Sequence, residues 1–427
     1  MKVDNVLKEV LVNINPPKED LDSISKFLKS FIPELEKSIK SLRIDASVFV
    51  GGSYAKGTMI KKGRYDVDVF IRFNGKYRGK DISKLAKTAL SKTKRKFSVV
   101  HGSRDYFHMD IEDNFYIEII PVINTQKAKE AENITDLSYF HVGYIRKKIK
   151  NKKILDEIKI AKAFLHACRC YGAESYVKGF SGYAVELVIC YYKTFINFAK
   201  SLSKLKEKQI IDIEKLYKNK TEIMMNMNGA KTESPIIIID PTYKERNALA
   251  ALSDETLERT KKACKEFLKN PKKENFEIKK PDLEKIKKNA EKKGTGFCVV
   301  RIVTDKQEGD IAGSKLVKFY NHLLDELNKY YKISSKGFEY NGKHEAQIFF
   351  SGKTKGEYLI AGPDIKDQKN RDAFELKHES VFVKGKRIYA KENCDEKIGE
   401  FIAEWKIKNY GKLKEMSITG LEIKDQI

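Results

Sequence analysis

Two carboxylates stand one residue apart in the apolar segment YDVDVFIRF, as Asp66 and Asp68. In a strand, alternate side chains point to opposite faces, so both carboxylates share one face and Val67 and Val69 share the other. Neighbouring like charges on a half-buried face are tolerated when a cation lies between them. Carboxylate oxygens suit Mg²⁺ and Mn²⁺. The spacing predicts a divalent metal site, although a lone pair of this kind is also typical of an exposed surface strand.

A glycine-rich turn, Gly51-Gly52-Ser53, lies between the apolar run VFV and a short helical stretch. Glycine lets backbone N–H groups approach an anion closely, and the first turn of a helix adds positive potential. On its own, the turn is equally typical of an ordinary strand-to-helix connection. Asp66 follows Ser53 by 13 residues. Together the two features predict a nucleotide held by its phosphates against a two-metal centre.

A third carboxylate on a neighbouring strand would complete this centre. The candidates are Asp110, Glu112 and Glu118. Asp110 and Glu112 stand beside a hairpin turn, where side chains face solvent. Glu118 instead lies in an apolar run just before Pro121, and an acid in such a position is paired or functional. We therefore expect Glu118 to be the third ligand.

The elements that position these residues are an N-terminal helix and a small sheet. Apolar residues at helical spacing predict a helix over 17–43. Strand patterns follow at 48–50, 67–73, 105–111 and 115–122, and the last two flank the turn at 112–114. This is an α/β module with a mostly antiparallel or mixed sheet, ending near residue 137.

The remainder of the chain changes period twice. Helices are predicted over 154–176, 181–202 and 254–268, followed by a Lys-rich boundary over 269–296. Beyond this boundary we expect a strand, a helix and then a hairpin with an Asn-Gly turn. A further helix and two strands follow at about 367–391, and a last helix covers 395–409. This order predicts a ferredoxin-like unit, a frequent RNA-binding scaffold.

The amino-acid composition indicates which class of partner the protein binds. Lys and Arg number 84 against 60 Asp and Glu, a formal net charge of +24 that favours a polyanionic partner. Basic residues concentrate at 146–153 and 269–293, although each lysine is also typical of a solvated helix face. The six cysteines form no CxxC pair, and no apolar run reaches ~18 residues. We expect a soluble, cytoplasmic protein without a membrane segment.

The motif hG-G-S-x-A-x-G-T, followed by D-x-D and by an acid before a proline, resembles the DNA polymerase β-type nucleotidyltransferase superfamily. Within it, the chain is similar over nearly its whole length to the archaeal-type (class I) CCA-adding enzymes, which are tRNA nucleotidyltransferases. The matching segments are GGSYAKGT…YDVDVF, YGAESYVKGFSGYAVELVICYY, DPTYKERNALAALS and AGPDIKDQKNRDAF. The central segments are specific to this family, whereas the first is shared by the superfamily.

The resemblance implies an α+β fold in three parts. These are a polymerase β-like nucleotidyltransferase head (1–137), a helical central domain that contacts base and tRNA (138–271), and a C-terminal α+β tRNA-binding body and tail (272–427). It further implies addition of C, C and A to the tRNA 3′ end from CTP and ATP, without a template, with two Mg²⁺ ions (or Mn²⁺). Pyrophosphate is the second product, and a homodimer is expected.

The resemblance also assigns residues. The serine of the turn and the basic residue three positions on contact the triphosphate in the family; here these are Ser53 and Lys56, next to Gly52. Arg246 falls where an arginine hydrogen-bonds the incoming base. The other matching nucleotide-binding positions are His141, Lys162 and Tyr171.

Some of these residues admit ordinary readings as well. Lys162 lies at the margin of an apolar helical stripe, which is also typical of a lysine whose stem lies along the surface. Taken alone, His141 is more typical of a structural histidine, Tyr171 of an aromatic residue at a helix end, and Arg246 of a surface charge beside a helix. Glu118 departs from the family, in which the third carboxylate is usually aspartate, and is one methylene longer.

Two alternatives stay open at this point. One keeps the chemistry and changes the product, as a poly(A) polymerase or an oligoadenylate-type nucleotidyltransferase would. The other is a non-catalytic RNA-binding relative that keeps the fold. The intact Asp66–Asp68 pair and the Gly-Gly-Ser turn argue against the second, because binding alone needs neither.

Overall fold

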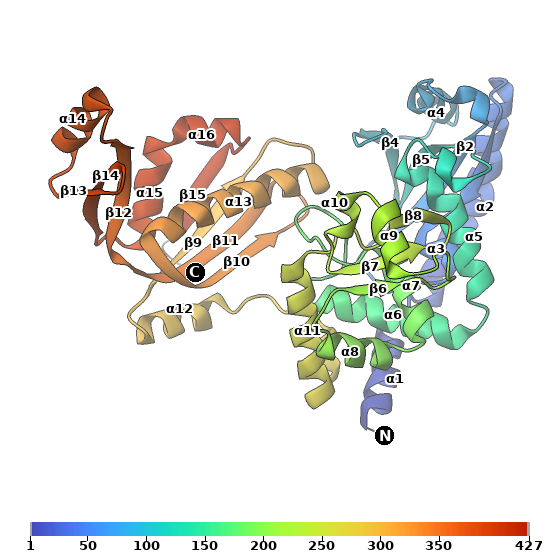
Figure 1. Ribbon diagram of the computed structural model, residues 1–427. Helices are drawn as coiled ribbons and strands as arrows, with labels where there is room; N and C mark the ends of the chain where they lie inside the picture. The colour runs from blue at the N-terminus through green and yellow to red at the C-terminus, as the bar shows by residue number, and fades with distance from the viewer. Residues whose placement is uncertain (1, 425–427) are drawn as a thin grey trace. The chain divides into compact units, whose positions relative to one another are not determined.

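The computed structural model describes residues 2–424, except for the side chains of Lys2 and Cys394. The chain divides into two compact units, within 1–279 and 280–427. Each combines helices and sheets, so the predicted α+β class is confirmed (Figure 1). The finer division of the first unit into a head (1–137) and a central domain (138–271) stays a prediction.

A five-stranded sheet with the order β1-β2-β5-β4-β3 organises the first part of unit 1. β2 and β5 run parallel and the other neighbours run antiparallel, which makes the sheet mixed as predicted. The strands are β1 (Ala46–Val50), β2 (Tyr65–Phe73), β3 (Ser98–Val100), β4 (Tyr106–Glu112) and β5 (Phe115–Ile123).

Helices cover one face of this sheet. α2 (Lys18–Ser41) and α4 (Ile82–Ser91) bury apolar side chains in one cluster with Val67, Val69 and Ile119. Alternation along β2 and β5 sends the apolar side chains into this core and leaves the carboxylates on the opposite face. The short helix α3 (Gly52–Lys56) follows β1 directly.

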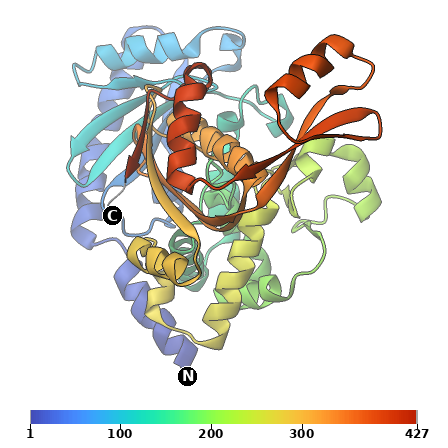
Figure 2. The same cartoon turned by 90° about the vertical axis from the view of Figure 1, so that its left-hand side faces the viewer.

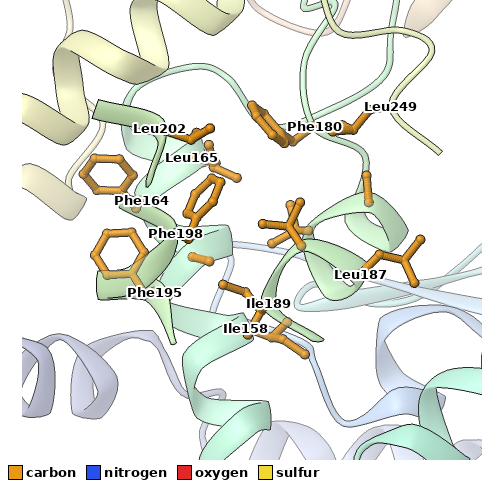
Figure 3. Close-up of a cluster of buried hydrophobic side chains, with 14 of the residues drawn as sticks. Ile158, Phe164, Leu165, Phe180, Leu187, Ile189, Phe195, Phe198, Leu202 and Leu249 are labelled. Atoms are coloured by element: carbon orange, nitrogen blue, oxygen red, sulfur yellow. The ribbon is translucent and has the colours of Figure 1, made fainter. Parts of the chain in front are cut away.

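The second part of unit 1 packs helices around a separate core. Figure 3 shows Phe164, Leu165, Phe195 and Phe198 converging in it. Its helices are α1 (Lys2–Ile14), α5 (Ser138–Lys148), α6 (Lys152–Ala167), α7 (Gly182–Tyr192), α8 (Phe195–Lys204), α9 (Lys220–Asn226), α10 (Gly229–Thr232) and α11 (Asp254–Lys269). α1 was not anticipated from the sequence.

Two predicted helices are shorter than expected. The helix predicted over 154–176 ends at Ala167, because Arg169 adopts a left-handed backbone with φ of 58°. The helix predicted over 181–202 is broken into α7 and α8 at Lys193, where φ is 69°. The central region also holds a three-stranded sheet that sequence reasoning missed, formed by β6 (Gln209–Ile211), β7 (Ile236–Asp240) and β8 (Tyr243–Asn247).

Unit 2 is built on a four-stranded antiparallel sheet with the order β10-β11-β9-β15. Taken in chain order, this is the strand arrangement of a ferredoxin-like unit. Its elements are α12 (Leu283–Lys292), β9 (Gly296–Val303), α13 (Asp310–Tyr330), β10 (Tyr331–Tyr340), β11 (Glu345–Thr354), α15 (Ile398–Lys408), α16 (Tyr410–Glu415) and β15 (Gly420–Lys424). The Asn341-Gly342 turn joins β10 and β11, with Gly342 at φ of 82°.

One detail of the predicted unit is wrong. The segment 356–394 does not complete the ferredoxin-like sheet but forms an inserted three-stranded sheet with its own helix, which projects in Figure 2. Its elements are β12 (Gly356–Asp364), α14 (Gln368–Lys377), β13 (Val381–Lys384) and β14 (Arg387–Cys394). The fourth strand is instead β15, after the last helices.

Among the residues described, no helix has both the length and the apolar composition of a membrane-spanning helix.

Candidate active site

The glycine-rich turn and the carboxylate strand are in direct contact. The Gly51 N–H donates to the Asp68 carbonyl oxygen at 2.9 Å, where β1 ends beside β2. Gly52 has φ of 60°, and a Cβ placed there would lie 1.6 Å from Oδ2 of Asp68. Only glycine therefore fits at position 52, and it brings the start of α3 directly against this carboxylate.

The register of the parallel strands gathers the acids. Asp68 is the register partner of Glu118, and Asp66 is the partner of Tyr116. Side chains at paired positions of adjacent strands share a face, so Asp66, Asp68 and Glu118 lie on one face of the sheet. Asp110, on β4, is exposed and forms an ion pair with Arg64.

Burial and mutual repulsion make these acids hard to ionise together. Burial, followed by the charge of Asp66, raises the pKa of Asp68 to about 6. Burial, followed by the charges of Asp68 and Asp66, raises the pKa of Glu118 to about 8. The Lys62 ammonium offsets part of the repulsion and lies 2.6 Å from Oδ1 of Asp66.

The donor set is one that a hard divalent cation fits. It consists of carboxylate oxygens on two adjacent strands, with more negative charge than the nearby lysine balances. As their side chains stand, no three His, Cys, Asp or Glu residues within 2–424 converge closely enough to hold a metal ion. The fit therefore rests on the chemistry and placement of the acids.

A cavity of about 180 Å³ opens beside the turn. Of the residues singled out from the sequence, its lining includes Gly52, Ser53, Lys56, Asp66, Lys162 and Tyr171. Asp68, Glu118, His141 and Arg246 are not in the lining. The remaining wall is formed by Thr58, Met59, Ile60, Lys62, His166, Gly182 and Glu186.

A buried carboxylate, Glu186, joins the two lysines of this cavity. Its Oε2 lies 2.7 Å from the Lys56 ammonium, and its Oε1 lies 3.0 Å from that of Lys162. The Thr58 hydroxyl donates to the same Oε1 at 2.7 Å. Burial alone would raise the pKa of Glu186, but Lys162, Lys56 and the Thr58 hydrogen bond lower it to about 2.

A second buried carboxylate, Asp240, joins His141 and Arg246. Its Oδ2 lies 3.0 Å from Nε2 of His141 and 2.8 Å from Nη1 of Arg246. The Tyr183 hydroxyl donates to Oδ1 at 3.0 Å, and its ring stacks on His141 with centroids 3.9 Å apart. Although burial alone would raise it, the pKa of Asp240 is well below its usual range because of the His141 and Arg246 contacts.

Tyr171 is part of the lining of the 180 Å³ cavity. Its ring stacks on His166 with centroids 4.0 Å apart. A Cβ at Gly182 would lie 2.7 Å from the Tyr171 hydroxyl oxygen, so the start of α7 passes close to it. Burial raises the pKa of Tyr171, which keeps its hydroxyl protonated.

Sequence reasoning missed several members of these networks. Glu186 and Asp240 are the most consequential, and both carried a usable signal. Each is an acid in an apolar run, GYAVELVICYY and PIIIID, which is the pattern that drew attention to Glu118. Thr58 is the last residue of the GGSYAKGT motif, which was a usable signal, whereas Lys62 and His166 carried none.

Two family models match unit 1. Residues 156–277 match the second domain of tRNA nucleotidyltransferase. Residues 1–139 match the Second Messenger Oligonucleotide or Dinucleotide Synthetase domain.

Curated relatives extend the similarity. The chain is 43% identical over 238 residues to the CCA-adding enzyme of Nanoarchaeum equitans, a match that spans 56% of this chain and only 58% of that protein. It is 26% identical to the CCA-adding enzyme of Methanocaldococcus jannaschii, over 91% of this chain and 87% of that protein. The CCA-adding enzyme of Thermococcus gammatolerans is 25% identical over 96% of this chain and 90% of its own length.

Solved structures share the fold. An RNA terminal uridylyl transferase, Cid1, superposes with a TM-score of 0.51 at 13% identity, covering 64% of this chain and 97% of that chain. A cytoplasmic RNA terminal U-transferase has a TM-score of 0.50 at 14% identity, covering 65% and 99% respectively. These likenesses agree with a nucleotidyltransferase fold.

Proposed function

We propose that the chain is an archaeal-type CCA-adding enzyme, and that it adds C, C and A to the 3′ end of tRNA from CTP and ATP. The reaction is a template-independent nucleotidyl transfer that releases pyrophosphate. The observation that carries this proposal is the contact of the Gly51-Gly52-Ser53 turn with Asp68. It brings the turn, which we take as the phosphate cradle, into contact with Asp68, one of the three carboxylates proposed as metal ligands.

The cradle supplies the phosphate contacts. We assign the triphosphate to the Ser53 hydroxyl, the Lys56 ammonium and the backbone N–H groups near Gly52, all at the wall of the cavity. Lys162 and Tyr171 line the same cavity and complete its nucleotide-binding side. His141 and Arg246, joined through Asp240, are assigned to the base.

The metal-binding role is assigned to Asp66, Asp68 and Glu118. When bound there, two Mg²⁺ or Mn²⁺ ions would neutralise phosphate charge and activate the tRNA 3′-hydroxyl. The protein's own groups hold the α-phosphorus in line with that hydroxyl and keep the leaving pyrophosphate in the cradle. No nucleophilic side chain is needed, because positioning and charge neutralisation account for the catalysis.

The decisive experiment is an incorporation assay. The purified protein is incubated with tRNA lacking its CCA end, Mg²⁺ and one labelled nucleoside triphosphate at a time, and products are separated at single-nucleotide resolution. We expect two CMP additions, then one AMP addition, and then a stop. Open-ended AMP addition would instead identify a poly(A) polymerase or oligoadenylate-type enzyme, and no addition would leave a non-catalytic RNA-binding relative.

Assembly and location belong to the proposal as well. We expect a homodimer and a cytoplasmic location, as the family resemblance implies. Light scattering of the purified protein measures the first, and a monomer at working concentration would contradict it.

A further inference from the structure

Glu186 is a buried acid that is not one of the three carboxylates assigned to the metal site. Its side chain is 0% exposed, and it lies on α7, one turn beyond Tyr183. It receives the Lys56 ammonium on one oxygen, and the Lys162 ammonium and Thr58 hydroxyl on the other. A carboxylate this deep inside a protein is expensive unless it is fully paired, which this one is.

The two lysines differ in how many N–H donors of the ammonium group are already used within the protein. Lys162 is 2% exposed and donates to the Thr58 carbonyl oxygen, the Thr58 hydroxyl and Glu186, at 3.2, 2.9 and 3.0 Å. An ammonium group has three N–H donors, so these contacts use all of them. Within residues 2–424, the Lys56 ammonium makes one hydrogen bond, to Glu186, and Lys56 lies on α3 at the cavity wall with Ser53.

The arrangement leaves one net positive charge facing the cavity. Lys162 and Glu186 neutralise each other. Thr58, which follows α3 in the chain, fixes their orientation through its hydroxyl, which contacts both side chains. Glu186 then fixes the flexible stem of Lys56, whose remaining N–H groups are available to a ligand. A fixed, charged donor binds a phosphate more tightly than a mobile one, because less side-chain entropy is lost.

We propose that Glu186 is a positioning residue for the polyphosphate, holding Lys56 in its binding orientation, with Lys162 as its buried counter-ion. The inference rests on the proposed function, since it takes the cavity to hold a nucleoside triphosphate. Lys162 keeps its place in the lining of the cavity, and its ammonium group holds Glu186 and the Thr58 hydroxyl in place.

The test compares binding of ATP and AMP, without tRNA, to the full-length protein and to Glu186→Gln. The two ligands share the base and the sugar and differ in the polyphosphate. We expect Glu186→Gln to weaken ATP binding about tenfold and to change AMP binding less than about twofold. Equal losses for both ligands would indicate a merely structural role and overturn the proposal, as would unchanged ATP binding.

Two further variants keep the outcome interpretable. Asp136→Asn removes another fully buried carboxylate, paired with Arg104 away from the cavity, and should leave the ATP-to-AMP preference unchanged. If Glu186→Gln fails to fold, Thr58→Val removes the hydroxyl that donates to Glu186 and accepts from Lys162, and should weaken ATP binding about threefold with AMP binding intact. Unaltered ATP binding by that variant would also contradict the proposal.

The same experiment separates this inference from the proposed function. If the unmodified protein prefers ATP and incorporates CMP and AMP while Glu186→Gln behaves identically, only the positioning role of Glu186 is wrong. If the unmodified protein shows no preference for ATP over AMP and no incorporation, the proposed function fails and the inference with it.

Discussion

The carboxylate of Asp68 is the single group whose loss tests the proposed chemistry most directly, because it lies between the glycine turn and Glu118. We expect Asp68→Asn to lower incorporation of both CMP and AMP by about 10²-fold or more, while tRNA binding is unchanged. Single-turnover incorporation and filter binding measure the two effects. Asp110→Asn is the matched control in the same sheet, since Asp110 is exposed and paired with Arg64. Retained activity in Asp68→Asn would remove the metal-site assignment.

Glu186 also predicts a pH dependence of stability. Its pKa is about 2 in the folded protein and near 4.5 when unfolded. A carboxylate whose pKa is lowered by folding contributes stability above its unfolded pKa and loses it as the pH falls toward its folded pKa. Urea unfolding should therefore show Glu186→Gln to be about 3 kcal/mol less stable at pH 5–7, with a difference about 1 kcal/mol smaller at pH 3.5. A difference independent of pH would contradict this account.

The placement of some site residues could be predicted from the sequence, whereas that of others could not. Strand parity alone is enough to put Asp66 and Asp68 on one face. The pairing of Asp68 with Glu118 depends on the register between β2 and β5, which are separated by a helix and two strands, and local pattern does not encode it. The Glu186 and Asp240 networks each depend on one contact between distant parts of the chain, 130 positions for Lys56–Glu186 and 99 for His141–Asp240, and only tertiary packing reveals such contacts.

At the scale of elements, the β1–α3 turn makes the sharpest prediction. Gly52 and Gly57 both have positive φ, of 60° and 68°, so alanine costs about 1 kcal/mol of backbone strain at either. Only at Gly52 would the new Cβ collide with Asp68; at Gly57 the nearest atom is a Leu155 methyl 3.8 Å away. We expect Gly52→Ala to abolish incorporation and Gly57→Ala to retain most of it, at similar thermal stability. Equal activity of both variants would show that the close approach to Asp68 is unimportant.

The type and order of the elements followed largely from periodicity, whereas their ends did not. The apolar stripe of 181–202 is continuous in sequence, yet Lys193 turns the backbone between α7 and α8. The run PIIIID became strand β7, fully buried, where no alternation distinguishes a strand from a helix. In unit 2, the strands of the inserted sheet at 356–394 have the same local sequence pattern as β15, the fourth strand of the ferredoxin-like sheet. Only their pairing partners distinguish them.

At the scale of the whole molecule, unit 2 has a core of its own. Its buried apolar cluster is drawn entirely from residues between Cys298 and Leu421. We expect a fragment of residues 280–427 to fold alone, with α+β circular dichroism and a single cooperative thermal transition. Dispersed amide signals in a proton–nitrogen correlation spectrum would check its packing. A fragment without a cooperative transition would mean that the core depends on unit 1.

The net charge of +24 predicts how the whole chain binds tRNA, and the structure selects the residues that test it. In the basic run at 146–153, Arg146 donates to the Ala55 carbonyl and Lys148 pairs with Glu214, whereas Lys147 and Lys150 are exposed. We expect tRNA affinity to fall at least about tenfold between 50 and 200 mM salt, because each phosphate that the protein neutralises releases counterions.

The double variant Lys147→Gln/Lys150→Gln should reduce the slope of log affinity against log salt by about 2, roughly one for each phosphate that is no longer neutralised. Lys148→Gln is the matched control, since its charge is already neutralised by Glu214 at 2.6 Å, and it should leave the slope nearly unchanged. Filter binding over a salt series measures all three proteins. If the affinity for tRNA did not change with salt, the chain would not bind the tRNA phosphates. If the double variant kept the slope of the unmodified protein, the basic run at 146–153 would not bind them, because counterion release depends on the phosphates bound rather than on total charge.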